Sequence, residues 1–524
     1  MARLLLKNGR IFVGRPGTGF AEAAAIAGRR IVAVGSLEEV ENVAGGFEVV
    51  DLAGGVAVPA FCDSHIHLLT YGQNLSGVQL FGAKSPEEAA TRVALRAQIA
   101  RPGSWITGIG WSKEEFSDRR FPTKKPLDNI SPHNPVALYS RDYHTLWLNS
   151  AALRILGIGK DQALRSDGDI LIGEDKEPEG VLLEHAAKEA FARIPQQSDV
   201  GKMAALDAAF GRLYSLGVLS AHNMDSDGDM DLFSRMDEEG RLGIRVVAYI
   251  GSKALDDAMA VGLHTGGPGG LRLRFGGLKL IKDGTLGSQT AMMIDPYEAS
   301  TAKGMDLMPE AQLNELIKRA NDRGIGVAVH AIGDAANREV LDAFSKSGRQ
   351  EKWLVNRMEH VQLLSEEDLP RPAALGLASS MQPVHMEGDI GPAEMVWGGR
   401  CRFAYAMKSL QRSGSPLLFG SDAPVADPNP LLGIYHAVTR KCSDGKPERG
   451  WYPEERLTVE EAVRAYTWNP SELYKEHGER GSIEPGKLAD IAVLDEDIFS
   501  CHKDRIRKAK VTVTMMEGDI VYRV

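Results

Sequence analysis

The sequence predicts an α/β fold: a (β/α)8 barrel of the TIM type, with a small β-sandwich domain formed by both termini and a long insertion after the first barrel strand. Two observations lead to this prediction. Through the middle of the chain, short apolar runs alternate with helical patterns, and eight of these runs can be counted as parallel strands. At both ends of the 524-residue chain, short β-rich runs surround tight turns instead.

The two ends share this strand-and-turn pattern. Residues 1–57 contain several short apolar runs and a turn at Asn8-Gly9, and residues 480–524 contain runs such as 511–515. Neither piece has enough apolar surface to fold well alone. We therefore expect the two pieces to pair into one discontinuous domain beside the barrel.

Residues 58–479 are expected to form the barrel. A stretch of about 72–210 follows the first strand and is too long for one crossover, so we expect an insertion with elements of its own. The eight expected strands cover residues 58–67, 217–222, 244–250, 277–283, 326–330, 357–361, 377–382 and 417–422.

Reactive residue types gather at the ends of these strands, where a barrel places its reacting side chains. His65 and His67 end the first strand two residues apart, so both imidazoles face the same way. The later strands end in His222, Lys279 with Asp283, His330, His360 and Asp422. Imidazole and carboxylate ligands without thiolates suit zinc, or manganese, iron or nickel, in a catalytic site.

The composition argues against several other classes of protein. Basic residues number 61 and acidic residues 71, for a net charge of −10, and no basic run suggests nucleic-acid binding. No stretch approaches the roughly 20 apolar residues of a membrane span, and no signal peptide is evident, so we expect a cytoplasmic protein. The four cysteines lack CxxC spacing, which argues against disulfides or a thiolate zinc site, and Cys62 is expected to be a buried apolar residue.

Several motifs in order resemble the amidohydrolase superfamily, and within it amidohydrolase family 3, the YtcJ-like hydrolases. They run through nearly the whole chain: Pro59-Ala-Phe-Cys-Asp-Ser-His-Ile-His67, Arg141 to Ser150, Glu179 to Glu184, Lys279-Leu-Ile-Lys-Asp283, Val329-His-Ala-Ile-Gly-Asp334, Met358-Glu-His360, Met381-Gln-Pro-Val-His385, Phe419-Gly-Ser-Asp422 and Gly481 to Asp495.

The resemblance implies a metal site. His65 and His67 would hold one divalent cation, and His330 and His360 would hold a second. The expected metal is zinc. Lys279, as its N6-carboxylated form, would bridge the two cations; Lys282 points the other way along the strand.

Asp422 would contact one metal and act as general base, then as the acid that protonates the leaving amine. The implied reaction is hydrolysis of a C–N bond in a small molecule, an amide, N-acyl compound or cyclic amide, by a metal-activated hydroxide.

Six side chains are expected to contact the substrate: Trp111, Tyr143, His144, Glu184, Asp283 and His385. The aromatic ones come from the insertion, which we expect to cover the pocket and to favour a substrate with an apolar or aromatic portion. Tyr143 and Gln289 depart from the residues usual in the family, so the substrate itself stays open.

Other interpretations remain. A mononuclear hydrolytic deaminase of a nitrogen heterocycle would be favoured by a glutamate soon after His330, where the sequence has only Asp334. A catalytically silent barrel could serve as a binding or regulatory protein, and Lys279 could be an ordinary ion-pair partner of Asp283. The number of metal ions per chain, one or two, is also left open. The expected assembly is a homo-oligomer, with a dimer as the first candidate.

Overall fold

The structure is a computed structural model that describes residues 3–141, 145–163, 169–195, 197–225, 229–267, 269–348 and 354–524. The chain forms two compact units: Met1–Leu68 with Phe210–Val524, and Leu69–Ala209. Among the described residues, no helix combines the length and the apolar character needed to cross a bilayer.

An eight-stranded parallel barrel sheet forms the centre of the larger unit, and its strands follow one another in chain order. They are β8 (Phe61–Ile66), β15 (Val218–Asn223), β16 (Arg245–Ile250), β17 (Leu273–Ile281), β18 (Val327–Ala331), β19 (Arg357–His360), β20 (Ala378–Met381) and β21 (Leu417–Phe419). Most positions in these strands are buried, as expected where helices cover the outer face of a parallel sheet. The predicted barrel and its eight strands are confirmed.

Backbone hydrogen bonds join the first and last strands just beyond their carboxyl ends. The Asp422 N–H donates to the His65 carbonyl at 2.6 Å, and the His67 N–H donates to the Ala423 carbonyl at 2.9 Å. Residues far apart in sequence therefore meet at the end of the barrel where reacting groups are expected.

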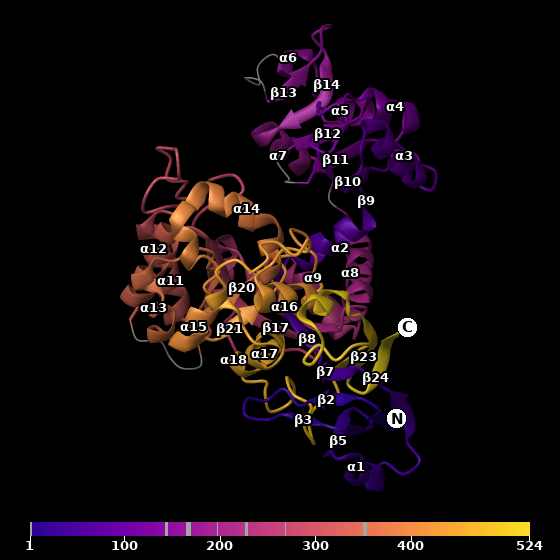
Figure 1. The fold of residues 1–524 in the computed structure, drawn as a ribbon. Coiled ribbons are helices and arrows are strands. Elements are labelled where there is room, and N and C mark those ends of the chain that lie inside the picture. The colour runs from indigo at the N-terminus through magenta and orange to yellow at the C-terminus, as the bar shows by residue number, and fades with distance from the viewer. Residues whose placement is uncertain are drawn as a thin grey trace. The chain divides into compact units, whose positions relative to one another are not determined.

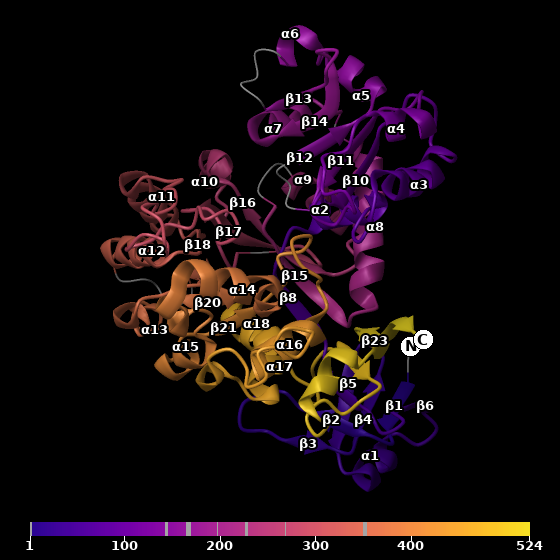
Figure 2. The same cartoon turned by 45° about the horizontal axis from the view of Figure 1, so that its top comes forward.

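Helices lie outside the strands, as α11 and α12 show (Figures 1 and 2). The barrel unit contains α9 (Met230–Glu238), α10 (Leu255–Ala260), α11 (Glu310–Asp322), α12 (Asp334–Lys346), α13 (Arg371–Ala374), α14 (Met386–Trp397), α15 (Met407–Ser413), α16 (Pro430–Thr439), α17 (Val459–Tyr466) and α18 (Trp468–Leu473). Their sequences explain them. In α12 the residues Ala336, Val340 and Phe344 recur every four positions and are all buried. A capping box of Thr458 and Glu461 starts α17.

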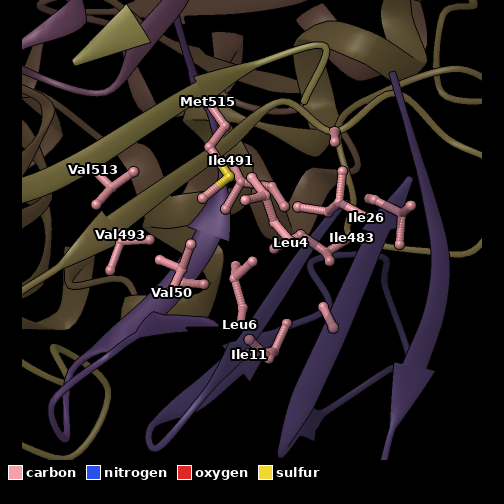
Figure 3. Packing of buried hydrophobic residues seen from close by; sticks show 14 of the residues in the cluster. Leu4, Leu6, Ile11, Ile26, Val50, Ile483, Ile491, Val493, Val513 and Met515 are labelled. Carbon is pink, nitrogen blue, oxygen red and sulfur yellow. The ribbon is translucent and has the colours of Figure 1, made fainter. Parts of the chain in front are cut away.

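Strands from both termini pack together as two sheets. One sheet has the order β5 (Arg30–Gly35), β4 (Ala23–Ala27), β1 (Arg3–Lys7), β6 (Glu48–Asp51). The other has the order β24 (Asp519–Arg523), β23 (Val511–Met516), β22 (Ile491–Leu494), β7 (Val56–Pro59), β2 (Arg10–Phe12), β3 (Phe20–Ala21). A buried cluster that includes Leu4, Leu6, Ile491 and Met515 fills the space between them (Figure 3).

The predicted first strand, residues 58–67, is wrong in one respect, because the chain changes sheets at Ala60. Before it, β7 pairs with β22 and β2 in the terminal domain; after it, β8 pairs with β15 in the barrel. The Ala60 N–H donates to the Asp490 carbonyl at 3.0 Å, whereas the Phe61 N–H donates to the Gly217 carbonyl at 2.9 Å. Both strands are buried throughout, so the apolar pattern contains no sign of the break.

Residues 69–209 form the second unit around a six-stranded sheet. Its order is β13 (Ile170–Ile172), β14 (Pro178–Leu183), β12 (Thr145–Leu148), β11 (Val136–Ser140), β10 (Ile106–Trp111), β9 (Val78–Gln79). The associated helices are α2 (Leu68–Ser76), α3 (Pro86–Ala97), α4 (Lys125–Ile130), α5 (Ser150–Ile155), α6 (Lys160–Ala163), α7 (Glu184–Ala192) and α8 (Asp199–Tyr214), of which α2 and α8 cross the boundaries of this unit. The predicted insertion after the first barrel strand therefore has a fold of its own.

Candidate metal centre

His65, His67 and Asp422 converge at the carboxyl end of the barrel. The Nε2 atom of His65 lies 3.4 Å from Oδ1 of Asp422, and Nε2 of His67 lies 3.2 Å from the same oxygen. The histidines come from the end of β8 and the aspartate from the segment after β21, the two strands that close the barrel. Three atoms that commonly bind metals are thus gathered around one point.

A second histidine pair adjoins this group. The ring centroids of His65 and His360 are 4.8 Å apart, and those of His330 and His360 are 4.4 Å apart. Three buried residues each offer one ligand atom, and these atoms lie within 4.8 Å of one another: His65, His360 and Asp422. Together they could hold a metal ion.

Two buried polar atoms of this group are poorly satisfied within the part of the chain that the structure describes. Nδ1 of His360 has no hydrogen-bond partner, and Oδ1 of Asp422 has no better contact than the Nε2 atoms of His65 and His67, at 3.4 and 3.2 Å. A buried acceptor without a partner costs free energy, on the order of 1–3 kcal/mol. A divalent cation would use both atoms as ligands, so the donor set fits a metal.

The backbone at these positions adopts an uncommon conformation. The φ angles are 71° at His360, 46° at Val361 and 59° at Asp422, all in the left-handed region that residues other than glycine rarely occupy. Such conformations gather at functional sites, where the surrounding structure holds them. The turn at His360 also ends the strand alternation, so that both Glu359 and His360 lie next to His65.

Three of the imidazoles are neutral at pH 7, as a metal ligand must be. Burial, with the charge of Lys279 nearby, lowers the pKa of His65 to about 4 and that of His330 to about 3. Burial and the adjacent His330 hold the pKa of His360 well below its ordinary value. Their ring nitrogens therefore have lone pairs available.

A carboxylate contacts the outer nitrogen of each histidine in the first pair. Nδ1 of His65 lies 2.6 Å from Oε2 of Glu359, and Nδ1 of His67 lies 3.1 Å from Oδ1 of Asp225. Burial works to lower the pKa of His67, but its contacts with Asp225 and Asp422 raise it to about 10. A cation that takes Nε2 of His67 must therefore displace a proton.

The sequence patterns do not point to Glu359 or Asp225, the two carboxylates that contact His65 and His67. Glu359 lies inside the Met358-Glu-His360 motif. One signal was available for it: Arg357 and Glu359 alternate along a strand that is otherwise apolar, which places two charges on the same face. Nothing comparable marks Asp225.

Lys279 is buried within β17, 7% exposed, and lies in the field of the site's carboxylates. Burial lowers its pKa to about 8, while the charges of Glu359 and Asp422 oppose that shift. A lysine with a pKa in this range has an appreciable neutral fraction at physiological pH.

Asp283 makes structural contacts. Its two carboxylate oxygens accept hydrogen bonds from the backbone N–H groups of Met292 at 2.8 Å, Gly333 at 2.9 Å and Ile332 at 3.0 Å. Its Oδ1 is also 3.5 Å from Nε2 of His330. Asp283 thus ties together the segments that follow β17 and β18, and its expected substrate contact stays a prediction.

His385 lies beside the histidine group. Its Nε2 donates to the carbonyl oxygen of Ser421 at 3.1 Å, and its ring is nearly parallel to that of His360, with centroids 6.4 Å apart. The position, next to the centre but outside the closest three residues, is compatible with the substrate contact expected for it.

The comparisons with known proteins agree with this geometry. The model of the amidohydrolase family matches residues 48–522. The chain belongs to the amidohydrolase family.

Members of the amidohydrolase family with similar sequences include YtcJ of Bacillus subtilis (strain 168), which is 30% identical and matches over 94% of each chain. An N-substituted formamide deformylase of Arthrobacter pascens is 26% identical, over 100% of this chain and 98% of the relative. The crystal structure of an uncharacterized metal-dependent hydrolase from Pyrococcus horikoshii OT3 superposes with a TM-score of 0.80 at 28% identity, covering 96% of this chain and 99% of the other.

His222, at the end of β15, lies within the barrel of this amidohydrolase-family chain but is engaged elsewhere. Its Nδ1 accepts a hydrogen bond from Arg357 at 2.8 Å, and its Nε2 is 3.5 Å from Sγ of Cys62. Burial and the Arg357 charge hold its pKa well below the ordinary value. Cys62 is buried as expected, and burial raises the pKa of its thiol to about 12.

The candidates in the insertion are only partly settled by the structure. Trp111 is 1% exposed, stacks on Phe116 and donates its indole N–H to the Leu138 carbonyl at 2.9 Å. It is therefore a core residue rather than the substrate contact that the sequence predicted. Glu184 is exposed at the start of α7, and Tyr143 and His144 lie outside the described residues.

Proposed function

We propose that this protein is a metal-dependent hydrolase that cleaves a carbon–nitrogen bond in a small molecule. One observation carries the proposal: Nε2 of His65 and Nε2 of His67 lie 3.4 and 3.2 Å from the same oxygen of Asp422, at the carboxyl end of a barrel. That arrangement suits a divalent cation, and membership of the amidohydrolase family supports hydrolysis as the reaction.

In this proposal His65, His67 and Asp422 hold one cation, and His330 and His360 hold a second. Imidazole and carboxylate donors without a thiolate suit zinc at a catalytic site. Lys279 would bridge the two as its carbamate. Its lowered pKa, about 8, supports this role because only a neutral amine reacts with carbon dioxide.

A bound divalent cation would supply a water of lowered pKa and a polarised substrate carbonyl. Asp422 would take a proton from the attacking water and return it to the leaving nitrogen as the C–N bond breaks. Burial alone would raise the pKa of Asp422, but the neighbouring His65 and His67 hold it well below its ordinary value. The carboxylate is therefore ionised and ready to act as a base.

N-Substituted formamides, other N-acyl compounds and cyclic amides are the first substrates to test. The Arthrobacter pascens relative, an N-substituted formamide deformylase by name, aligns with the whole of this chain at 26% identity. An N-formyl or N-acyl bond presents a carbonyl to polarise and a nitrogen to protonate, which are the two tasks assigned to the site.

The deaminase alternative has less support. Four residues after His330, where such an enzyme would need a carboxylate to move protons, Asp334 uses one oxygen to accept hydrogen bonds from the N–H groups of Ile294 and Ala335, at 2.8 and 2.9 Å. Asp334 is thereby committed to the start of α12.

The test combines metal content with product analysis. We expect protein purified without chelator to contain one to two equivalents of a zinc-like metal per chain and to release amine from members of the N-acyl panel. Removing the metal should abolish the release, and restoring zinc should recover it. Ammonia release from heterocycles instead would support the deaminase, and metal-free purified protein would contradict the proposed site.

A further inference from the structure

The two histidines of the first pair are each held at the nitrogen that faces away from Asp422. Glu359 contacts Nδ1 of His65 at 2.6 Å, and Asp225 contacts Nδ1 of His67 at 3.1 Å. Because Nδ1 is occupied in both rings, Nε2 is the atom left to face Asp422 in both. Neither Glu359 nor Asp225 was among the expected metal ligands.

Glu359 is itself fixed by Arg357. The guanidinium donates from Nε to Oε1 at 2.5 Å and from Nη2 to Oε2 at 3.1 Å, a bidentate pair in which both side chains are 0% exposed. Paired geometry of this kind restricts orientation as well as adding interaction energy. The carboxylate therefore has a single position from which to contact His65.

Arg357 is in turn anchored to three other strands of the barrel. It donates to the Ser64 carbonyl at 2.5 Å, to Oγ of Ser380 at 2.8 Å and to Nδ1 of His222 at 2.8 Å. These partners lie on β8, β20 and β15. The partners are a strand carbonyl, a serine hydroxyl and a buried imidazole, so the barrel itself determines where Glu359 lies.

In the second histidine pair only one ring has comparable support among the described residues, because His330 has a hydrogen-bond partner and His360 does not. Nδ1 of His360 has no partner. Nε2 of His330 is 3.2 Å from the Gly284 carbonyl and 3.5 Å from Oδ1 of Asp283, which already accepts backbone N–H groups. The two pairs therefore differ in how firmly their rings are oriented before a cation binds.

We propose that Glu359 and Asp225 are positioning residues that hold His65 and His67 in their ligating orientation in the absence of metal, so that this pair binds the more tightly held cation. The proposal rests on the proposed function, since it requires a metal at this site. Carboxylates behind ligating histidines fix the tautomer and the ring orientation, and their loss typically weakens metal affinity about 10- to 100-fold.

The experiment measures the release of Zn²⁺ from the purified holoprotein to a chromogenic chelator. Wild type is compared with Glu359→Gln and Asp225→Asn, which keep the size of each side chain and remove its charge. We expect the slowly released Zn²⁺ of the wild type to bind about 10- to 100-fold more weakly in each variant. The rapidly released Zn²⁺ should be unchanged.

Matched controls separate positioning from a general loss of stability. Glu455→Gln removes a buried carboxylate that accepts the Ser409 N–H at 2.9 Å, and Asp237→Asn removes one that accepts the Arg272 N–H at 2.8 Å. Neither carboxylate contacts a candidate ligand. Both controls should keep the wild-type Zn²⁺ affinity even where their melting temperatures fall.

The outcomes are distinct. If Glu359→Gln does not fold, Asp225→Asn decides, because its pair with the partly exposed His67 is not fully buried. Wild-type Zn²⁺ affinity in a folded Asp225→Asn and a folded Glu359→Gln would overturn the inference and leave the proposed function standing. Wild-type protein that binds no Zn²⁺ would overturn the proposed function itself.

Discussion

Lys279 in β17 and Lys282, the first residue after that strand, point to opposite sides of the barrel wall. Lys279 lies near Glu359 and Asp422 at the candidate metal centre. Nζ of Lys282 instead contacts Asp306 at 2.7 Å, Glu339 at 2.6 Å and the Met308 carbonyl at 2.9 Å. Strand alternation produces this difference, and it supplies a matched pair for mutation.

Lys279→Ala should lower the metal content, because the bridging group would be lost. Lys282→Ala should keep the metal and lower the free energy of unfolding by about 1.5–3 kcal/mol, the usual contribution of hydrogen bonds to charged groups. Elemental analysis and urea unfolding of both variants provide the measurements. Equal metal content in Lys279→Ala and wild type would remove Lys279 from the site.

Asp422→Asn should reduce kcat about 10²- to 10⁴-fold, the range expected when a general acid–base group is lost. Asp427→Asn, five residues later, is the control, since that exposed side chain accepts the Asn429 N–H at 3.0 Å and is not a candidate ligand. Steady-state kinetics on an N-acyl substrate, with metal content measured in parallel, tests the difference. Activity near the wild-type level in metal-loaded Asp422→Asn would contradict the role of this carboxylate.

Trp111→Ala should destabilise the unit of residues 69–209 by about 3–5 kcal/mol, because a fully buried aromatic side chain is removed from its core. Phe81→Ala, which changes a side chain 45% exposed in the same unit, should cost much less. Denaturant unfolding followed by tryptophan fluorescence measures both. A variant with unchanged stability but a raised KM would return Trp111 to the substrate-binding residues.

Stability should fall with acid because of His436. Its Nδ1 donates to the Lys441 carbonyl at 2.7 Å, and burial lowers its pKa below the unfolded value of about 6.5. Below about pH 6.5, His436 therefore binds a proton more readily in the unfolded chain than in the folded chain. The stabilisation is complete above pH 6.5 and is lost below it, at up to about 1.4 kcal/mol per pH unit.

The measurement for His436 is the free energy of unfolding of wild type and His436→Gln between pH 7 and pH 5. The variant should show the shallower dependence, because other buried histidines contribute equally to both proteins. Parallel curves for the two proteins would show that His436 does not take up a proton on unfolding in this range.

The sequence was sufficient to predict the barrel, because each strand is an apolar run followed by a helical pattern, and to find His65, His67, His330, His360 and Asp422 at strand ends. The sequence did not reveal the role of Glu359 beside His65, for a physical reason. Alternation assigns Glu359 and His360 to opposite faces, and only the positive φ of 71° at His360 brings both to His65. Such a turn needs no glycine, so no residue type marks it.

Trp111 illustrates a second limit. An aromatic residue in an apolar segment has the same pattern whether it lines a pocket or fills a core. Its burial and the Leu138 carbonyl that accepts its indole N–H are tertiary facts, which depend on how β10 and β11 pair.

The change of sheet at Ala60 has a consequence for biosynthesis. Strand β7 leads directly into the strand of His65, yet one of its edges pairs with β22, which is synthesised much later than β7. During translation that edge of β7 is unpaired until β22 is made, and β21, the strand that closes the barrel beside β8, is also made later. A nascent chain released before Ile491–Leu494 would keep an unpaired apolar strand, the kind of edge that recruits other chains into aggregates.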